Sequence, residues 1–440
     1  MQLLPAILFV IPSLFCSSLI EAANSLNVTD YPSLQEALDA NPGKVLHVPA
    51  GTYELKNALQ IRHEGGGLEG FGHLIQTNPS QAIIRLENSK GLRLFGLTLS
   101  RPEENADTSE AGIAASQCPG LVIEDVTVLD NRTDSAAIRV QESDGIRISH
   151  CTVENYQRVT VDDRLKSENY GYAFRCINGT GIEVRYSSNV LIEGNRVTET
   201  HLRPTKEMQE KYQLGKFTQK NPEKGKIVNQ MTWDEEYMQA WHQGSAIIVD
   251  APEVAHYIRI LGNHIENAAQ GLDIHADNVT VANNMIVNAF MGMKAMHGSR
   301  HILITGNQFI RNAIWSIGLM PGAASHAKMA EKADNSDGGS IISNNIIAEF
   351  GQGDSAWIWG DERAPIRFDN GQLPHNPPLS DVLVTGNVIY DSSLLIPDSK
   401  ERRTLYRYAV QISDEVRGLH FSGNLFHAGR DGLSNRPMEP

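Results

Sequence analysis

Seven ionisable residues recur at matching positions within short apolar segments of the chain. The segment Gly271-Leu272-Asp273-Ile274-His275 is an example. Histidine, lysine and arginine beside carboxylates can remove a proton and neutralise the negative charge that develops as a result. Two carboxylates can instead protonate a leaving group and activate a water molecule. The candidate catalytic residues are Glu183, Arg185, Asp250, Asp273, His275 and Lys294, and Arg139 is a candidate substrate-binding residue.

Short alternating runs must position these residues. In six runs apolar and polar residues alternate, which predicts β-strands with the apolar side chains inward and the interleaved side chains outward. Further alternating runs end in asparagine, mostly after a small residue, and these follow the first runs along the chain. The first runs are residues 137–141, 181–185, 246–250, 271–275, 292–296 and 409–413, and the asparagines are Asn195, Asn263, Asn284, Asn307, Asn345, Asn387 and Asn424.

The spacing of the asparagines predicts a solenoid. Asn263, Asn284 and Asn307 follow one another at intervals of about 20 residues, which is typical of one supersecondary unit stacked on the next. The runs are rich in Ile and Val, lack the fixed Leu spacing of a leucine-rich repeat, and therefore favour a parallel β-helix. Because asparagine tolerates turn geometry and can hydrogen-bond the next coil, we interpret these asparagines as structural.

Aligning the first runs of successive coils predicts two outward columns. One column contains Arg139, Glu183, Ile248, Asp273 and Lys294, and the other contains Gln141, Arg185, Asp250, His275 and Met296. Neighbouring strands lie about 4.8 Å apart. We therefore expect Arg185, Asp250 and His275 to be contiguous, Asp273 to contact Lys294, and the backbones of Glu183 and Asp273 to lie roughly 9–10 Å apart. A solvated, charge-paired surface is the alternative interpretation.

Two long insertions, residues 156–178 and 200–243, precede the strands that carry Glu183 and Asp250. Loops of this length are usually functional, so we expect them to form walls beside the two columns. The second insertion contains rings that could pack on sugars, and these are predicted substrate-binding residues: Trp233, Tyr237, Trp241 and His242. On later coils, Trp315, Trp357 and Trp359 are interpreted as core residues.

The ends and the composition limit the class of protein. Residues 1–22 are predicted to be a signal peptide, because Leu3 to Leu14 is mostly apolar and Ala22-Ala23 offers a small-residue cleavage site. Residues 23–440 are predicted to form one domain, secreted or periplasmic. The net charge of −14 argues against non-specific nucleic-acid binding. No later stretch approaches the ~18 consecutive apolar residues of a membrane span, and the three remaining cysteines indicate no disulfide framework.

The N-terminal phrases complete a resemblance to a known superfamily. Ser33-Leu34-Gln35-Glu36 has capping-box spacing and predicts a helix through Leu38 that covers the end of the solenoid. With Val48-Pro49-Ala50-Gly51-Thr52-Tyr53 and the runs ending in Gly-Asn, it resembles the pectate-lyase-like right-handed parallel β-helix superfamily over most of residues 30–430. The resemblance implies an all-β, single-stranded right-handed parallel β-helix with an N-terminal capping helix and two long loop insertions.

The same resemblance implies a function on polysaccharides. Members of the superfamily are mainly secreted or surface lyases, hydrolases of the polygalacturonase type, epimerases and phage tailspikes. The Asn-Thr-Asp, Gly-His-Gly and Arg-Ile-Lys phrases of polygalacturonases and the Asp-Pro-His-Asp phrase of alginate epimerases are absent here, so no catalytic residue is transferred from the superfamily.

Together with the columns, the resemblance predicts a polysaccharide-active enzyme. The first hypothesis is a lyase or epimerase that abstracts a proton from a uronate-containing polymer while cations neutralise the enolate. The first alternative is a glycoside hydrolase with two carboxylates about 6.5–9.5 Å apart, using Glu183 or Asp250 with Asp273. The second is a non-catalytic glycan-binding or surface β-helix protein. Ca²⁺ is a candidate cofactor because it prefers carboxylate oxygens, but no spacing assigns residues to it.

Overall fold

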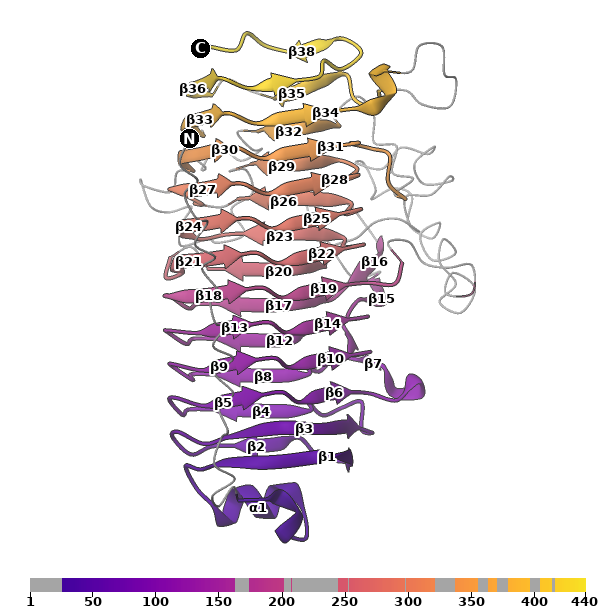
Figure 1. The fold of residues 1–440 in the computed structure, drawn as a ribbon, viewed down its shortest axis with the longest axis vertical. Coiled ribbons are helices and arrows are strands. Elements are labelled where there is room, and N and C mark those ends of the chain that lie inside the picture. Colours follow the sequence, from indigo (N-terminus) through magenta and orange to yellow (C-terminus); the bar gives the residue numbers. More distant parts are fainter. Residues whose placement is uncertain are drawn as a thin grey trace, which may run out of the picture.

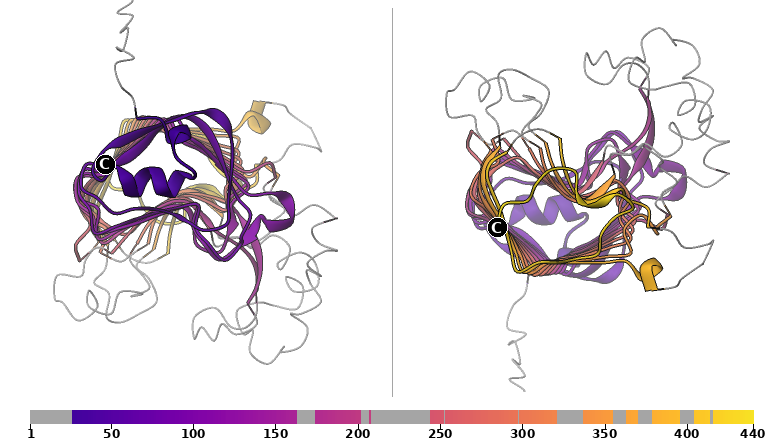
Figure 2. Two further views of the ribbon diagram at one scale, coloured as in Figure 1. Left: turned by 90° about the horizontal axis from the view of Figure 1, so that it is seen from below. Right: turned by 90° about the horizontal axis from the view of Figure 1, so that it is seen from above.

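The computed structural model describes residues 26–162, 174–201, 207, 244–251, 253–296, 298–320, 337–354, 363–369, 379–395, 404–413 and 416–440. Over these ranges the chain winds into a stack of coils, and the strands that form the coils pair in parallel with the equivalent strands of the next coil (Figure 1). Viewed along the stack, the coils superpose around one continuous interior (Figure 2). The predicted parallel β-helix is confirmed. The predicted signal peptide, residues 1–22, lies outside the described residues.

The first runs of the sequence form one sheet, which we call the first sheet. Its strands pair in chain order, so a residue in one coil lies beside its counterpart in the next. Within the described residues its strands are β2 (Leu59–Ile61), β4 (Ile84–Glu87), β8 (Ile113–Ser116), β12 (Ala136–Gln141), β17 (Thr180–Arg185), β20 (Ser245–Asp250), β23 (Gln270–Ile274), β26 (Met291–Ala295), β29 (Trp315–Leu319), β32 (Ala364–Phe368), β35 (Tyr408–Ile412) and β38 (Gly432–Ser434).

The runs that precede the asparagines form a second face. It follows the first sheet in each coil, and from β18 onward each strand is followed by one of the asparagines. Its described strands are β5 (Arg93–Phe95), β9 (Val122–Glu124), β13 (Arg147–Ser149), β18 (Val190–Glu193), β21 (His256–Leu261), β24 (Asp277–Ala282), β27 (Ile302–Thr305), β30 (Gly338–Ser343), β33 (Ser380–Thr385) and β36 (Arg417–Ser422).

A third face lies directly after the asparagines, and the sequence patterns did not predict it. Its strands have only two or three residues, too few to show a period of two. The described ones are β6 (Thr98–Ser100), β10 (Thr127–Leu129), β14 (Thr152–Glu154), β19 (Arg196–Thr198), β22 (His264–Glu266), β25 (Met285–Val287), β28 (Gln308–Ile310), β31 (Ile346–Ala348), β34 (Val388–Tyr390) and β37 (Leu425–Phe426).

The N-terminal end of the solenoid is capped as predicted. Helix α1 (Leu34–Ala40) begins after Ser33, whose side chain accepts a hydrogen bond from the backbone N–H of Glu36. Short helix η1 (Val28–Asp30) precedes it, and the long strands β1 (Val45–Leu55) and β3 (Gly67–Gln76) form the first coils (Figure 1). The register of β1 against β3 shifts between Val48 and Gly51, so Pro49 and Ala50 form an irregularity inside β1.

Some short elements lie in the connections between these faces. Strand β7 (Asp107–Thr108) pairs with β11 (Arg132–Thr133), and two further connections contain the one-turn helices η2 (Glu103–Asn105) and η5 (Ser392–Leu395). The strands of the first sheet pair in unbroken chain order on either side of these elements. The connections therefore leave the register of the first sheet intact.

Apolar residues from all three faces fill the interior. Ile182, Val184, Ile192 and Val197 come from one coil and are fully buried. Close packing explains why residue 292 in β26 is glycine, because a Cβ atom there would lie 2.9 Å from the ring of Phe309. Cys118 and Cys151 are buried free thiols.

The asparagines form a buried ladder along one corner of the solenoid. From Asn195 to Asn387, each side-chain Nδ2 donates to the Oδ1 of the next asparagine at 2.9–3.0 Å. The same oxygens accept the backbone N–H groups of the preceding asparagines. Cys151, one coil before the ladder, donates its backbone N–H to Asn195 Oδ1 at 2.9 Å. This network confirms the structural interpretation of the asparagines.

Replacing Asn284 with leucine is expected to lower the free energy of unfolding by about 2–3 kcal/mol, because the buried N–H donors of Asn263 lose their acceptor, and Asn307 Oδ1 and the Ile260 carbonyl each lose one donor. Chemical denaturation measures the loss. Asn424→Leu is the matched control at the last rung, where the side chain is only partly buried and water can replace the bond. Equal losses at both positions would contradict the expected role of burial.

Candidate functional site

Five consecutive strands of the first sheet carry the candidate residues. The pairing places Arg139 beside Glu183 and Arg185 beside Asp250. Ile248 pairs with Asp273, and Asp273 pairs with Lys294. The two outward columns derived from the sequence therefore have the predicted register. Strands β12, β17, β20, β23 and β26 hold these columns at fixed spacing, since parallel pairing leaves little freedom along the strand direction.

The side chains form one continuous series of ion pairs. Arg139 Nε lies 2.9 Å from Glu183 Oε2, and Arg185 Nη2 lies 2.8 Å from Asp250 Oδ2. Arg185 also links the columns, because its Nε lies 4.0 Å from Glu183 Oε1.

His275 continues the series and joins the two aspartates. Its Nε2 lies 2.7 Å from Asp273 Oδ1, its Nδ1 lies 3.5 Å from Asp250 Oδ1, and Lys294 Nζ lies 3.2 Å from Asp273 Oδ2. All seven residues that the sequence singled out on the first sheet are thus brought together. We call this group the charged ladder: Arg139, Glu183, Arg185, Asp250, Asp273, His275 and Lys294.

Burial and charge set the protonation of Asp273. The residue is 5% exposed, and burial by itself would raise the pKa of its carboxyl group. The charges of Lys294 and His275 and their hydrogen bonds outweigh burial and bring this pKa to about 2. An ionised carboxylate only accepts hydrogen bonds, so Nε2 of His275 carries the hydrogen between them. In the neutral ring the lone pair is then on Nδ1, which faces Asp250.

Glu183 has the opposite shift. Burial raises the pKa of its carboxyl group, and the guanidinium groups of Arg139 and Arg185 only partly offset this, while the negative charge of Asp250 adds to it. The pKa values of two carboxyl groups in the charged ladder, those of Asp273 and Glu183, are therefore shifted in opposite directions. Oppositely shifted pKa values are a property of acid–base sites.

The insertions are described in part. Residues Arg158–Asp162 (β15) and Phe174–Asn178 (β16) of the first insertion form an antiparallel hairpin, which the sequence patterns had not resolved. The predicted substrate-binding residues of the second insertion lie outside the described residues: Trp233, Tyr237, Trp241 and His242. Trp357 and Trp359 also lie outside them.

A buried carboxylate that the sequence did not indicate joins the starting points of the two insertions. Glu199 follows β19, and its Oε1 accepts the backbone N–H of Gln157 at 2.6 Å. Its Oε2 lies 3.5 Å from Arg132 Nη1. Burial raises the pKa of Glu199 to about 7, although Arg132 and the backbone N–H groups lower it. The partners lie more than forty residues away in the sequence, so no local signal could have found this contact.

Glu199→Gln is expected to flatten the dependence of stability on pH. Because the pKa of Glu199 is raised from 4.5 to about 7 in the native state, the native chain binds more protons between these values than the unfolded chain. Its contribution is therefore greatest below pH 4.5 and is lost as the pH rises through 7, by at most about 3 kcal/mol. Glutamine does not titrate, so the free energy of unfolding of the variant lacks this pH-dependent contribution.

Denaturation curves between pH 4.5 and 8 measure the effect of Glu199→Gln. Asp337, whose pKa burial raises to about 7, has the same sign and remains in the variant, so the difference from wild type reports Glu199 alone. Glu54→Gln, at an exposed position of β1, is the control. Parallel curves for wild type and Glu199→Gln would show that Glu199 does not titrate as expected.

In the parts of the chain that the structure describes, no three His, Cys, Asp or Glu residues are grouped so that they could hold a metal ion, and Ca²⁺ binding stays a prediction without assigned residues. No described helix has the length and hydropathy needed to cross a membrane.

Comparison with known proteins places the fold. The sequence matches no family profile, and no curated protein matches it. The structure is similar to the Agl-KA catalytic domain (TM-score 0.58, 13% identity, 95% of this chain and 68% of that one). It is also similar to a mutant of DFA-IIIase from Arthrobacter chlorophenolicus A6 in complex with DFA-III (TM-score 0.58, 13% identity, 95% and 100%). The Dettilon tailspike protein is a third similar structure (TM-score 0.57, 12% identity, 89% and 64%).

These similarities and the parallel coils establish one conclusion about class. The chain has the right-handed parallel β-helix fold. At 12–13% identity the similarities concern the fold. The chemistry must be argued from the charged ladder itself.

Proposed function

We propose that the protein is a carbohydrate-active enzyme that acts on a uronate-containing polysaccharide as a lyase or epimerase. The observation that carries the proposal is the position of His275, between Asp273 at 2.7 Å and Asp250 at 3.5 Å, with Lys294 on the far side of Asp273. A base oriented by a second group is the arrangement that proton abstraction requires.

His275 is the proposed base. Its Nδ1 is buried in this structure, 3.5 Å from Asp250 Oδ1, and would take the proton next to the carboxylate of a uronate once Asp250 moves aside for the substrate, while Asp273 holds the ring through Nε2–H. The negative charge of Asp250 stabilises the imidazolium that forms. Lys294, Arg185 and Arg139 supply positive charge where the enolate develops. In a lyase the electron pair of the broken C–H bond forms a double bond and expels the glycosidic oxygen, which takes up a proton. In an epimerase a proton returns to the opposite face of the same carbon.

Enzymes with the same fold support this proposal at the level of class. One similar structure is a catalytic domain, and another is a DFA-IIIase in complex with DFA-III. We extend the proposal to the second insertion, whose Trp233, Tyr237, Trp241 and His242 would bind the sugar rings. We also propose that residues 1–22 direct secretion, which N-terminal sequencing of protein recovered from culture medium would test.

Glycoside hydrolysis is the second candidate, and a specific observation favours it. Glu183 has a raised pKa and Asp273 a pKa of about 2, as expected for an acid paired with an ionised partner. Their backbones are two strand spacings apart, about 9.6 Å. The carboxyl groups of an inverting hydrolase lie about 6.5–9.5 Å apart, so side chains that lean toward each other from this backbone spacing would fall within that range.

A product assay separates the candidates. The full chain is incubated with polygalacturonate, alginate and neutral glucans. Ultraviolet absorbance from a new double bond indicates a lyase, new reducing ends without that absorbance indicate a hydrolase, and a changed uronate composition without cleavage indicates an epimerase. Binding of a polymer with none of these products would contradict the enzyme proposal and favour a glycan-binding module.

A further inference from the structure

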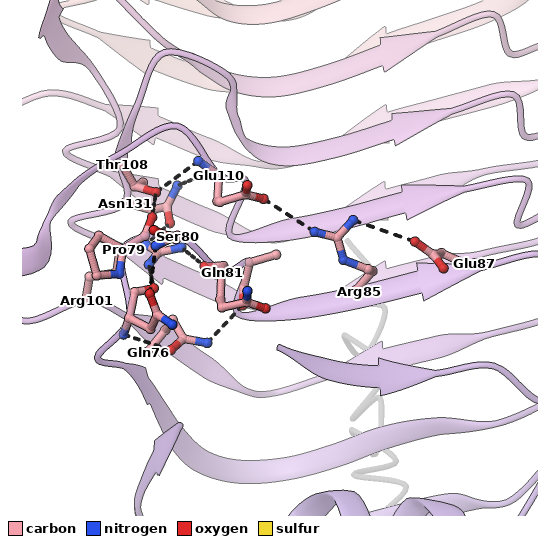
Figure 3. A network of polar contacts seen from close by, with 12 residues as sticks. Gln76, Pro79, Ser80, Gln81, Arg85, Glu87, Arg101, Thr108, Glu110 and Asn131 are labelled. Carbon is pink, nitrogen blue, oxygen red and sulfur yellow. Dashed lines mark hydrogen bonds and ion pairs between the residues drawn. The ribbon is translucent and has the colours of Figure 1, made fainter. Parts of the chain in front are cut away.

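The outward surface of the second face changes from charged to uncharged along the solenoid. On the N-terminal coils its outward side chains form ion pairs, and Arg147 Nη2 lies 3.8 Å from Glu124 Oε1. The first sheet is similar there, since Arg85 pairs with Glu87 and Glu110 (Figure 3). On β24, β27, β30 and β33, the two central outward columns of the second face consist of uncharged residues. We call them the neutral patch: Thr280, Ala282, Leu303, Thr305, Ile341, Ser343, Leu383 and Thr385.

The neutral patch is apolar along one column and hydrogen-bonded along the other. Leu303, Ile341 and Leu383 pair in register and are 37%, 40% and 38% exposed. Hydroxyl groups in the second column bond one another in pairs at 3.0 Å: Ser343 with Thr305, and Thr385 with Ser422 of β36. A partner can therefore cover the patch without leaving these hydroxyl groups unpaired. Contiguous exposed apolar side chains on a soluble protein mark an interaction surface.

Opposite charges lie at the two ends of the apolar column. Toward the N-terminus the column continues through Thr280 to Arg259. Toward the C-terminus it continues through His420 to Glu439, which pairs with β36 as a last short layer. Arg259 and Glu439 are both exposed, and each lies three coils from Ile341. The column therefore extends equally far on both sides of Ile341 and ends in opposite charges.

We propose that two copies of this chain associate through the neutral patch, with their solenoids antiparallel and Ile341 at the two-fold axis. In this arrangement each column faces its own reverse, so Leu303 meets Leu383 of the second copy, and Ile341 meets Ile341. Arg259 then lies opposite Glu439 of the second copy. Parallel solenoids would instead set the apolar column over the hydroxyl column of the second copy.

Charge favours a second copy at this place. The net charge of −14 makes two copies repel over most of their surface. The neutral patch adds no like charge to this repulsion, and the two contacts of Arg259 with Glu439 are attractive. The charged coils that precede β21 have no described coil of the second copy opposite them. The charged ladder is on the first sheet, outside this contact, so the inference does not depend on the proposed function.

The first experiment measures the mass of the full chain in solution by sedimentation and light scattering over a range of concentrations. The wild type is expected to be a dimer. Ile341→Lys is expected to weaken the dimer by at least about 100-fold, because two lysines then face each other across an apolar contact at the axis. Phe71→Lys is the matched control, since Phe71 is also an exposed apolar residue, 72% exposed, but lies on β3 away from the patch. It should leave the dimer unchanged.

A charge exchange tests the antiparallel arrangement. Arg259→Glu and Glu439→Arg are each expected to weaken the dimer about 3-fold to 10-fold, because each creates two like-charge contacts in a symmetric dimer. The double variant restores both attractive contacts and should return to within about 2-fold of the wild type. Arg147→Glu is the control, since Arg147 lies in the same outward column but two coils before Arg259. It should associate like the wild type.

The outcomes decide between this contact and others. A monomeric wild type, an oligomer other than a dimer, or a dimer that persists in Ile341→Lys would overturn the proposed interface. A dimer that Ile341→Lys disrupts, but that the charge exchange does not restore, would overturn the antiparallel arrangement. Thermal unfolding of each variant shows that the substitution leaves the fold intact, so a change in mass reports association.

Discussion

Replacing His275 with glutamine is expected to lower kcat on the polymer that the enzyme converts by about 10²-fold to 10⁴-fold. Glutamine can still donate a hydrogen bond to Asp273 from the place of Nε2, but it has no group that can take up the substrate proton. The loss should appear in kcat much more than in KM, because the side chain acts in the transition state of proton transfer and contributes little to binding of the substrate in the ground state.

His264→Gln is the matched control for this experiment. His264 also lies beside a carboxylate, with Nε2 3.4 Å from Glu266 Oε2, but on the third face of the solenoid. It should keep wild-type activity. Stability measured by denaturation shows whether His275→Gln is folded, since Asp250 and Asp273 lose a neighbour. A folded His275→Gln protein with undiminished kcat would contradict His275 as the base and leave the hydrolytic pair Glu183 and Asp273 as the better assignment.

Replacing Asp273 with alanine is expected to lower the free energy of unfolding by about 3–5 kcal/mol. Asp273 is the partner of both His275 and Lys294, whose side chains are only 9% and 17% exposed. Removing the shared carboxylate leaves Lys294 without its counter-charge and His275 Nε2–H without its acceptor. This arrangement costs more than the loss of an ordinary surface ion pair, which is worth about 0–1 kcal/mol.

Two further variants test the cause of that loss. Glu266→Ala removes the partner of a more exposed histidine and should change stability by less than about 1 kcal/mol. Asp273→Leu combined with Lys294→Met replaces the pair by apolar side chains and should recover much of the loss. A small effect of Asp273→Ala would show that water or another group replaces the carboxylate.

Acid provides a second measure of the same interaction. Because the pKa of Asp273 is lowered from 3.8 to about 2, its ionised form stabilises the native state above pH 3.8, and this contribution is lost as the pH falls toward 2. The free energy of unfolding of Asp273→Ala should therefore fall less than that of the wild type as the pH is lowered from 3.8 toward 2.

Much of the charged ladder could be predicted because a solenoid converts sequence position into spatial position. The period of the asparagine runs set the coils in register, and the parallel pairing then placed Arg185 beside Asp250 and Asp273 beside Lys294 as expected. The link between the two columns was not predicted. It depends on the side-chain conformations of Arg185 and His275, which reach across their own strands to Glu183 and Asp273.

Trp315 shows where the alternation fails. It lies two positions from Ile317, a fully buried core residue, so period two places its side chain inward. The side chain instead contacts the outward positions Gly318 and Arg367. At the start of a strand, the turn before it sets the backbone direction, so the alternation there carries little information.

The sequence by itself determined the class of fold, the capping helix, the asparagine ladder and the set of residues in the charged ladder. Each of these follows from local periodicity or from one repeat stacked on the next, which are properties of neighbouring positions. Only the tertiary structure decided the third face, the contact of Glu199 with Gln157 and the packing of Trp315 on Arg367. These contacts join segments through turns of unequal length, and their geometry is set by packing in three dimensions.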